Sequence, residues 1–449
     1  MHRRQLPLRS VNPVYFISLE DINPINRLKT RTLSDWLAWI ETLHPRTIDL
    51  GLERVHAVLD TMRLRRPTFA AITITGTNGK GSTTVMCETI LRRAGYRVGA
   101  YTSPHLIAYN ERIRIDGRNV SDDDLCAAFE RIEAARGSVP LTYFEFGTIA
   151  AFDLFQAAKI DIAVLEVGMG GRLDAVNAID SDVAIVTAVD IDHTAWLGHT
   201  REAIGYEKAG IFREGRPAIC GDPNPPAIIA AEAARIGAKL LQFNRDFIVE
   251  RSGTEWTWRC GERLRAGLPY PSLRGDYQMF NAACALTALE MLADRFPVTQ
   301  ADVREGLISG VIPGRFQVLP GRPVRVLDVA HNAQAARSLA ATLKQQRVEG
   351  RTLAVIGMLK DKDIASVIDP LTGVVDRWYP ATLHTPRGAT AAQLIESLAA
   401  AGVPAPARGY DDVHQAHAAA QREATEADRI VVFGSFHTVG DILAGLGKA

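Results

Sequence analysis

Short apolar runs alternate with longer stretches of helical periodicity from residue 69 onward. The runs predict strands at 69–75, 97–102, 161–167, 182–189 and 217–220, and the stretches predict helices at 82–94, 122–135 and 143–158. The predicted strands are apolar almost throughout, which is typical of parallel strands buried on both faces. Strands that alternate with helices indicate βαβ units, so we expect an α/β fold with a mostly parallel sheet.

The alternation breaks at residues 247–265, where polar and apolar residues alternate around Gly253 and predict an antiparallel hairpin. A helical stretch at 277–293 follows, and three prolines and two glycines then gather within 311–323. We predict a domain boundary here, because the alternation of strands and helices starts afresh beyond it. The later strands are expected at 324–329, 352–356, 377–381 and 430–433, and the later helices at 333–346, 391–401 and 412–425.

The composition argues against several classes of partner. Hydrophobic residues make up 47% of the chain and charged residues 23%, as in globular proteins with sizeable cores. Lys and Arg total 51, and Asp and Glu also total 51, so the overall charge gives no support to nucleic-acid or membrane partners. No apolar run is long enough to span a membrane, and the five cysteines contain no C-x-x-C pair. We therefore expect a cytoplasmic protein that meets any anionic ligand with local charge.

A glycine-rich stretch, GTNGKGS at 76–82, follows the first predicted strand and opens a predicted helix. This position turns free backbone N–H groups and the positive end of a helix dipole toward an anion. Lys80 can neutralise phosphate oxygens, and the hydroxyl of Ser82 can bind Mg²⁺. A plain strand-to-helix turn needs neither group, so we predict a phosphate-binding loop whose spacing differs from G-x-x-x-x-G-K-[ST].

Polar side chains also follow two further predicted strands. Glu166 ends one of them, and Asp190, Asp192 and His193 end the next. Because the carboxyl ends of parallel strands meet at one edge of a sheet, these groups suit a metal or phosphate site. A solvated glutamate and an ordinary loop histidine are the alternatives, and the residues alone leave them open.

Lys208 lies in a polar helical stretch, where a surface lysine is the ordinary interpretation. It can join a metal site only when it is neutral or converted to an anionic carbamate. Beyond the boundary, Arg315, Asp328 and His331 are expected to face a cleft between the domains, where ligands bind preferentially. A structural linker with Asn332 capping the next helix is the alternative for that segment.

The motifs occur in an order that resembles the Mur ligase superfamily and, within it, the dihydrofolate synthase/folylpolyglutamate synthase family. They run from about Leu33 to the C-terminus and include GTNGKGS, YTSPHL, ERIRIDG, LTYFEFGT, LEVGMGGRLDAVN, DHTAWLG, EKAGIFR, PGRFQ, DVAHN, AVIGMLKDKD and GSFHTV. The resemblance implies a P-loop ATPase-like parallel-sheet domain at 31–312 and a Rossmann-like α/β domain at 319–449, the Mur ligase architecture. Residues 1–30 are an extension without a counterpart.

The resemblance further implies an ATP-dependent ligase that adds L-glutamate to dihydropteroate, forming dihydrofolate, and to folates, forming folylpolyglutamates. The reaction is expected to pass through an acyl phosphate. The implied cofactors are ATP and two Mg²⁺ ions, with room for a monovalent cation, and the implied assembly is a monomer. Ala195, in a place where an acidic residue is expected, is a departure that bears on fine tuning and leaves the reaction class unchanged.

Residue roles also come from the resemblance. The catalytic residues are Lys80, His193 and Lys208, the last of them carbamylated. The ATP contacts are Thr77, Asn78, Gly79, Lys80, Gly81, Ser82, Asn281, Arg315 and Asp328, and the metal ligands are Ser82, Ser103, Glu166 and His193. The pterin substrate is expected to contact Thr42, Leu43, His44, Thr142, Tyr143, Phe144, Glu145, Leu173 and Asp174.

Other functions remain open at this point. A monofunctional folylpolyglutamate synthase is the nearest alternative, because LTYFEFGT favours the bifunctional form by resemblance alone. Another Mur-type amino-acid ligase is less favoured, because Gly81 follows the loop lysine where cell-wall ligases usually have a hydroxyl residue. A nucleotide-binding switch protein would use the loop without ligation and would leave Lys208, His193 and the second α/β domain without a purpose.

Overall fold

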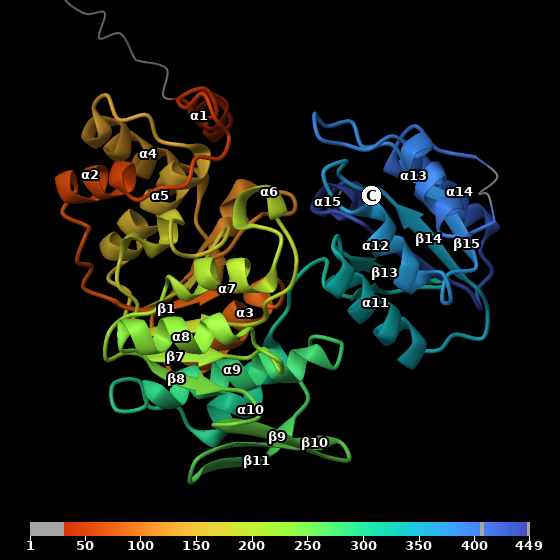
Figure 1. The fold of residues 1–449 in the computed structure, drawn as a ribbon. Helices are drawn as coiled ribbons and strands as arrows, with labels where there is room; N and C mark the ends of the chain where they lie inside the picture. The colour runs from red at the N-terminus through yellow and green to blue at the C-terminus, as the bar shows by residue number, and fades with distance from the viewer. Residues whose placement is uncertain (1–30, 405–407, 447–449) are drawn as a thin grey trace, which may run out of the picture.

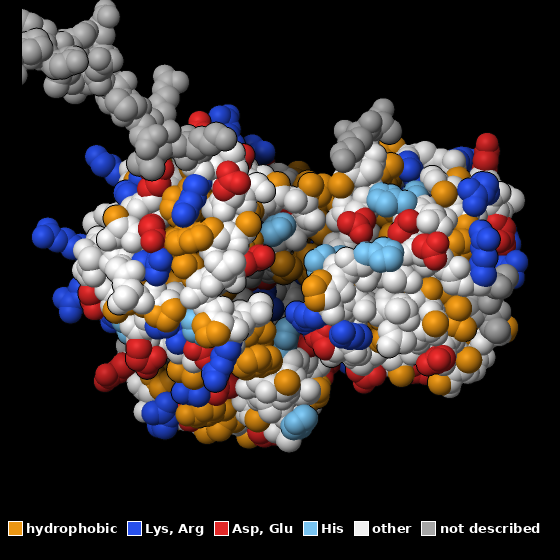
Figure 2. Space-filling view, turned by 90° about the horizontal axis from the view of Figure 1, so that it is seen from above, with side chains coloured by type: hydrophobic (Ala, Val, Ile, Leu, Met, Phe, Trp, Pro, Cys, Tyr) orange, Lys and Arg blue, Asp and Glu red, His pale blue; other side chains and the backbone are white. Residues whose placement is uncertain are grey.

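The structure is a computed structural model that describes residues 31–404 and 408–446, so the extension expected at 1–30 lies outside the described residues. Two lobes of unequal size make up the described chain (Figure 1). Figure 2 shows a hollow between them on one face of the molecule. No helix in these described stretches is long and apolar enough to cross a membrane.

The larger lobe is built on an eight-stranded sheet with the order β4-β3-β2-β5-β1-β6-β7-β8. Its strands are β1 (Ala70–Thr75), β2 (Val98–Tyr101), β3 (Ile113–Ile115), β4 (Arg118–Asn119), β5 (Ile162–Glu166), β6 (Val183–Val186), β7 (Pro217–Cys220) and β8 (Lys239–Gln242). The five predicted strands are confirmed as a buried parallel group formed by β2, β5, β1, β6 and β7. The strands at the two edges, β3, β4 and β8, were not predicted, because each is too short to form a clear apolar run.

The chain after β6 leaves the sheet earlier than predicted. Thr187 Oγ1 donates to the carbonyl of Asn78 at 2.6 Å, and the N–H of Thr77 donates to the carbonyl of Ala188 at 2.7 Å. The N–H of Thr187 still donates to the carbonyl of Thr75 at the end of β1, and beyond it the chain bonds to the glycine-rich loop. As a result, Asp192 and its neighbours lie on a loop beyond the sheet edge, and the prediction that they end a strand is wrong.

Helices cover both faces of the large sheet. The helices of this lobe are α1 (Leu33–Ile40), α2 (Glu53–Thr61), α3 (Lys80–Arg93), η1 (Tyr109–Arg112), α4 (Asp122–Arg136), α5 (Tyr143–Ala158), η2 (Ala175–Ala178), α6 (Thr194–Leu197), α7 (Arg201–Ala209), α8 (Ala227–Ile236), α9 (Tyr277–Met291) and α10 (Gln300–Ser309). Alternate side chains of β1 pack on opposite faces of the sheet. Ala71 lies in the core under α4 and α5, and Ile72 and Ile74 lie in the core under α3 and α9. The predicted helices of this lobe are confirmed, although α3 begins at Lys80 and not at residue 82.

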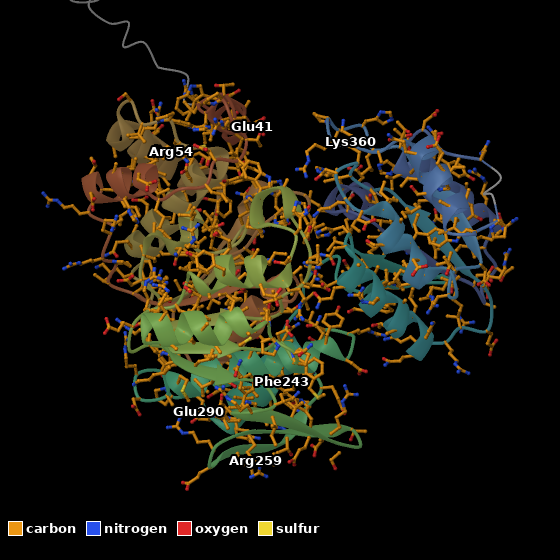
Figure 3. The ribbon with its side chains drawn as sticks, viewed as in Figure 1. Glu41, Arg54, Phe243, Arg259, Glu290 and Lys360 are labelled. Carbon is orange, nitrogen blue, oxygen red and sulfur yellow. The ribbon has the colours of Figure 1, made fainter. Side chains whose placement is uncertain are left out.

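A three-stranded antiparallel sheet covers the second of these cores, and it confirms the predicted hairpin. Its strands are β9 (Phe247–Ser252), β10 (Glu255–Cys260) and β11 (Arg263–Pro269). Trp256 and Trp258 are fully buried beneath it. Phe243 lies beside α9 in Figure 3, with its ring 5.6 Å from that of Phe247 and 5.1 Å from that of Phe280. The small sheet thus packs against α9, the helix that lies behind the glycine-rich loop.

The smaller lobe has a five-stranded sheet with the order β12-β13-β16-β14-β15, parallel except for β12. Its elements are β12 (Gln317–Leu319), β13 (Val324–Asp328), α11 (Ala333–Gln345), β14 (Thr352–Ile356), α12 (Ile364–Ile368), η3 (Asp369–Leu371), β15 (Arg377–Pro380), α13 (Ala391–Ala400), α14 (Val413–Glu423), β16 (Arg429–Phe433) and α15 (Phe436–Leu446). The predicted strands and helices of this lobe are confirmed, and β12, α12 and α15 were missed. The change from one sheet to the other falls between α10 and β12.

Candidate active site

Both lobes contribute to a cavity of about 430 Å³, called here the central cavity. The larger lobe supplies segments 76–81, 103–106 and 166–170 together with Asp192, His193 and Lys208, and the smaller lobe supplies Arg315, His331, Lys362, Arg387 and segment 434–437. Several of these segments follow the carboxyl ends of β1, β5, β14 and β16. Open α/β sheets bind their ligands at such strand ends, so this cavity is the candidate site.

The glycine-rich loop is shaped by Gly79, which caps α3 with a φ of 91°. A Cβ at this position would lie 2.4 Å from Asn281 Oδ1, so only glycine lets α9 pack this closely against the loop. Lys80 Nζ donates to the carbonyl of Gly76 at 2.9 Å and forms no ion pair among the described residues. Its burial lowers its pKa. A buried ammonium group over a helix N-terminus, without a carboxylate partner, is suited to an anionic ligand.

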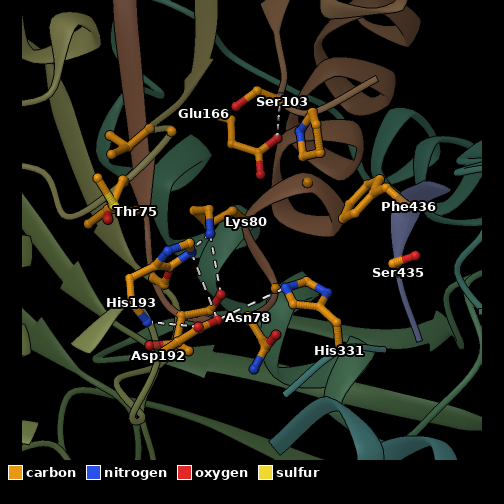
Figure 4. A pocket seen from close by; sticks show the side chains of 18 of the residues that line it. Thr75, Asn78, Lys80, Ser103, Glu166, Asp192, His193, His331, Ser435 and Phe436 are labelled. Atoms are coloured by element: carbon orange, nitrogen blue, oxygen red, sulfur yellow. Dashed lines mark hydrogen bonds and ion pairs between the residues drawn. The ribbon is translucent and has the colours of Figure 1, made fainter. Parts of the chain in front are cut away.

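Glu166 lies on the opposite side of the loop from Asn78 (Figure 4). Its side chain is buried, and the N–H of Ser103 donates to its Oε2 at 3.3 Å. Burial raises the pKa of Glu166, while Lys80 and Arg315 act in the opposite direction. Glu166 and Ser103 both line the cavity, and carboxylate and hydroxyl oxygens are hard donors that fit a divalent cation such as Mg²⁺.

Such a cation would need further ligands from the nucleotide and water. Across residues 31–404 and 408–446, no group of three or more His, Cys, Asp or Glu side chains converges as a metal cluster. Mg²⁺ typically keeps several waters and substrate phosphate oxygens beside one or two carboxylates, so this sparse donor set still suits it.

Asp192 links the two lobes at the floor of the cavity. Its Oδ1 accepts from Lys362 Nζ at 2.6 Å, and its Oδ2 accepts from Asn332 Nδ2 at 3.1 Å. The Nε2 atoms of His193 and His331 each lie 4.0 Å from its Oδ2 (Figure 4). Burial by itself raises the pKa of Asp192, but His193, Lys362 and His331 together hold it well below its usual range. Asp192 is therefore ionised and fixes both lobes around the site.

The two imidazoles are neutral near pH 7. Burial, with a contribution from Lys362, lowers the pKa of His193 and of His331 to about 4 each. His331 Nδ1 lies 2.8 Å from the carbonyl of Val329 and donates to it, which leaves its Nε2 lone pair free. His193 sits at the N-cap of α6 with a φ of 52°. A neutral His193 has a lone pair that can bind a metal.

Lys208 is buried on α7 with 3% of its surface exposed. Burial lowers its pKa to about 7, and Lys80 adds to the effect. Neutral amine is therefore far more common for Lys208 at pH 7 than for an ordinary lysine, which is almost entirely charged at this pH.

A second cavity of about 250 Å³ adjoins the first. It is lined by segment 47–51 and by Thr142, Phe144, Glu145, Leu173, Asp174 and Ala175, and it shares Ser103, Pro104, Arg112, Gly168, Met169 and His193 with the central cavity. Burial raises the pKa of Asp174 to about 7, although the N–H groups of Met169 and Val176 donate to its carboxylate at 2.8 and 3.0 Å. The two cavities form one connected space with a mixed apolar and polar wall.

Two descriptions of known families match the chain. The Mur ligase middle domain matches residues 74–289, and the Mur ligase glutamate ligase domain matches residues 314–436. A dihydrofolate synthase/folylpolyglutamate synthase of Escherichia coli is 45% identical over 411 residues, which cover 92% of this chain and 94% of the relative. This chain belongs to the dihydrofolate synthase/folylpolyglutamate synthase family of Mur ligases.

Other relatives of this Mur ligase agree. A dihydrofolate synthase/folylpolyglutamate synthase of Haemophilus influenzae is 38% identical and covers 94% of this chain and 99% of its own. The structure of E. coli FolC in complex with DHPP and ADP has a TM-score of 0.88 at 44% identity, over 93% of this chain and 98% of that chain. A bifunctional folylpolyglutamate synthase/dihydrofolate synthase with Mn, AMPPNP and L-glutamate bound has a TM-score of 0.86 at 46% identity, with the same coverage. The predicted family and fold class are confirmed.

The site residues predicted for this Mur ligase fall into three groups. Thr77, Asn78, Gly79, Lys80, Gly81, Ser103, Glu166, His193, Lys208 and Arg315 line the central cavity, and Thr142, Phe144, Glu145, Leu173 and Asp174 line the second one. Ser82 and Asn281 are buried directly behind the loop. Thr42, Leu43 and Tyr143 line neither cavity, and His44 reaches the second cavity only through Asp49, which lies 3.4 Å from its Nε2.

Asp328 lines neither of the two cavities. Its two oxygens accept from the N–H groups of Phe316 and Ala330, at 2.8 Å each, so its carboxylate ties the interlobe linker to the end of β13. Asn332 does cap α11, by accepting from the N–H of Ala335 at 3.0 Å, as one alternative predicted. It also reaches across the cleft to Asp192. The orientation of Asp328 follows from its burial, because a buried carboxylate needs hydrogen-bond donors and these two backbone N–H groups supply them.

Several residues of the site were missed. Lys362 follows β14 and Ser435 follows β16, and both line the central cavity beside His437. The argument from carboxyl strand ends that found Glu166 would have found them too, since both occur in quoted motifs after predicted strands. Arg112, which lines both cavities, gave no such signal because it lies in η1.

Proposed function

We propose that this protein is an ATP-dependent ligase that adds L-glutamate to dihydropteroate and to folates through an acyl-phosphate intermediate. One observation carries the proposal: a phosphate-type loop, acidic and histidine side chains, and cationic residues of a second lobe line a single cavity that opens into a second, partly apolar one. The names of the relatives, and the nucleotide, pterin-type and glutamate ligands in their structures, support the same reading.

The triphosphate of ATP is proposed to lie over the loop. The backbone N–H groups at the start of α3, the Lys80 ammonium and the Arg315 guanidinium offset its charge, and Asn281 and Asp328 provide further nucleotide contacts by family resemblance. Glu166, Ser103, Ser82 and His193 are the residues that would hold divalent ions there. Such ions, when bound, screen the phosphate charge and so favour phosphoryl transfer.

Lys208 is proposed to be carbamylated. A carbamate forms when a neutral amine adds to CO₂ and releases a proton, and burial, by lowering the pKa of Lys208 to about 7, favours the neutral amine. The product is an anion. Carbamylation would therefore replace an unfavourable buried cation with an anionic oxygen ligand, as Glu166 is. The adjoining charge of Lys80 favours this change of sign.

In the proposed reaction, a carboxylate oxygen of the pterin substrate attacks the γ-phosphorus of ATP, and the bond to ADP breaks. The amine of L-glutamate then attacks the acyl carbon, and phosphate leaves. Lys80 and Arg315 stabilise negative charge in both steps. Contact between the lobes excludes water, which would otherwise hydrolyse the acyl phosphate.

Three further properties are proposed with less specific support. A monomer is proposed because residues of a single chain line both cavities. The cytoplasm is proposed because all five cysteines are free thiols, as in a reducing compartment. A monovalent cation near the loop is proposed from the family resemblance.

The test uses purified protein with ATP, Mg²⁺, L-glutamate and either dihydropteroate or tetrahydrofolate. Phosphate release and a glutamylated product, identified by mass spectrometry, are expected with both pterins. Product from tetrahydrofolate alone would establish a monofunctional folylpolyglutamate synthase instead. Nucleotide binding with no amide product from either pterin would refute the ligase and leave a switch protein or a different Mur-type ligase.

A further inference from the structure

One cation stands at the junction of the two cavities. Six residues line both of them: Ser103, Pro104, Arg112, Gly168, Met169 and His193. Arg112 is the one arginine or lysine among these six, and a substrate that extends from one cavity to the other must pass it.

The side chain of Arg112 is held in place by neutral groups. Its Nε donates to His105 Nδ1 at 2.8 Å. A guanidinium N–H can only donate, so the Nδ1 atom of His105 is the acceptor in this bond. The guanidinium carbon lies 5.2 Å from the ring centroid of Tyr109 and 5.6 Å from that of Tyr143, at cation–π distance. These contacts orient the guanidinium without neutralising it.

Neighbouring arginines differ in this respect. Arg54 pairs with both Asp49 and Glu145, and Arg172 pairs with Glu207. Within the part of the chain that the structure describes, Arg112 forms no ion pair. Its sequence neighbour Glu111 is not available, because its carboxylate accepts from the N–H groups of residues 106, 107 and 108 at 2.7, 2.9 and 2.8 Å.

An oriented guanidinium with its terminal N–H groups free is a site for a planar anion. Arginine binds a carboxylate through two parallel hydrogen bonds, and such charge-assisted pairs are stronger than neutral ones. A partly buried charge without a partner is unfavourable, so a ligand that brings the missing carboxylate gains affinity.

The chemistry of the two pterin substrates differs at this point. The residues proposed to act on the reacting carboxylate, Lys80, Glu166 and Lys208, line the central cavity and not the second one. A substrate that enters from the second cavity therefore passes Arg112 before its reacting carboxylate reaches them. In dihydropteroate, the stretch just before that carboxylate is an uncharged aromatic ring. In a folate, it carries the α-carboxylate of the terminal glutamate, which does not react.

We propose that Arg112 binds the non-reacting α-carboxylate of the terminal glutamate in folate substrates and so determines specificity for folates over dihydropteroate. The proposal rests on the ligase function proposed above. It assigns to Arg112 a role in polyglutamate formation that dihydrofolate formation does not need.

The test compares Arg112→Gln with wild type, and Arg118→Gln on the exposed strand β4 is the matched control. Steady-state rates are measured with tetrahydrofolate and with dihydropteroate at saturating ATP and L-glutamate. Arg112→Gln is expected to lose about tenfold or more in kcat/KM for tetrahydrofolate, mainly through KM, and less than about twofold for dihydropteroate. The kcat/KM of Arg112→Lys for tetrahydrofolate should lie between those of wild type and Arg112→Gln, because lysine keeps the positive charge but cannot form two parallel hydrogen bonds. An equal loss with both substrates would overturn the proposal.

A second comparison is made first within the wild-type protein, so its main result does not depend on whether a variant folds. Wild-type protein is given tetrahydrofolate whose α-carboxylate is replaced by a carboxamide, with the γ-carboxylate intact. It should use this analogue about tenfold or more less efficiently than tetrahydrofolate, and Arg112→Gln should treat the two alike. Wild-type protein that does not discriminate between them refutes the assignment. Activity with dihydropteroate, measured alongside, separates this failure from a failure of the ligase function itself.

Discussion

Lys208 is the buried group whose replacement tests the electrostatics of the site most sharply. Its pKa falls from 10.5 to about 7 because burial removes the ammonium from water. At about 1.4 kcal/mol for each pKa unit, holding this lysine charged in the fold costs roughly 5 kcal/mol as an upper limit. Lys208→Met keeps the length and apolar character of the side chain and removes the charge. We expect the variant to be more stable than wild type at pH 7, at the expense of activity.

The pH dependence gives the sign of the effect. Between pH 7 and 10.5 the unfolded chain holds a proton on Lys208 that the folded chain has released, so wild-type stability rises with pH across this window. Below pH 7 both states are protonated, and the full penalty remains. The advantage of Lys208→Met should therefore be greatest at or below pH 7 and should vanish as the pH approaches 10.5.

The assay is thermal unfolding of the apo protein in buffer freed of bicarbonate and metal ions, between pH 6 and 10. Lys360→Met is the matched control, because Lys360 is exposed on the smaller lobe (Figure 3). Lys208→Met should raise Tm at pH 7 by several degrees, and the control should not change it. Adding bicarbonate with Mg²⁺ should stabilise wild type and leave Lys208→Met unaffected. A variant that melts at or below the wild-type temperature across the whole pH range would refute the reasoning.

Three more predictions follow from single contacts. Lys80→Met should lower turnover by at least about a hundredfold, measured by phosphate release, without lowering Tm, because its ammonium bonds only to loop carbonyls. Asp192→Asn should lower the free energy of unfolding by up to about 3–5 kcal/mol, and Tm with it, because it leaves the Lys362 ammonium without its partner. The double variant Asp192→Asn with Lys362→Met should regain stability; if it is no more stable than Asp192→Asn, the ion pair does not matter. Asp174→Asn should remove an inflection near pH 7 from the pH profile of the pterin KM, and an unchanged profile would show that Asp174 does not titrate there.

The sequence was sufficient for the parts of the site that one sheet positions. Glu166 and the glycine-rich loop follow predicted parallel strands, and the geometry of such a sheet places strand ends together without further information. His193 came from the same argument, although β6 ends earlier because Thr187 bonds to the loop. Local hydrogen bonding moved that strand end, and no apolar pattern encodes it.

Contacts between the lobes could not be predicted in the same way. Asp192 and Lys362 are 170 residues apart and meet only because two separate sheets face one another. Asp328 turned inward to satisfy backbone N–H groups at the linker, a role that its position after a strand does not reveal. The charge state of Lys208 depends on its burial on α7, and the polar composition of that helix predicts exposure instead.

The most direct test of the proposed ligase follows one oxygen atom. When both carboxylate oxygens of dihydropteroate are ¹⁸O, attack on ATP and displacement by L-glutamate carry one labelled oxygen into the released phosphate. Mass spectrometry of that phosphate should find one ¹⁸O atom per molecule formed, together with dihydrofolate in equal amount. Phosphate without the label, or released at the same rate when the pterin is omitted, would contradict an acyl-phosphate ligase.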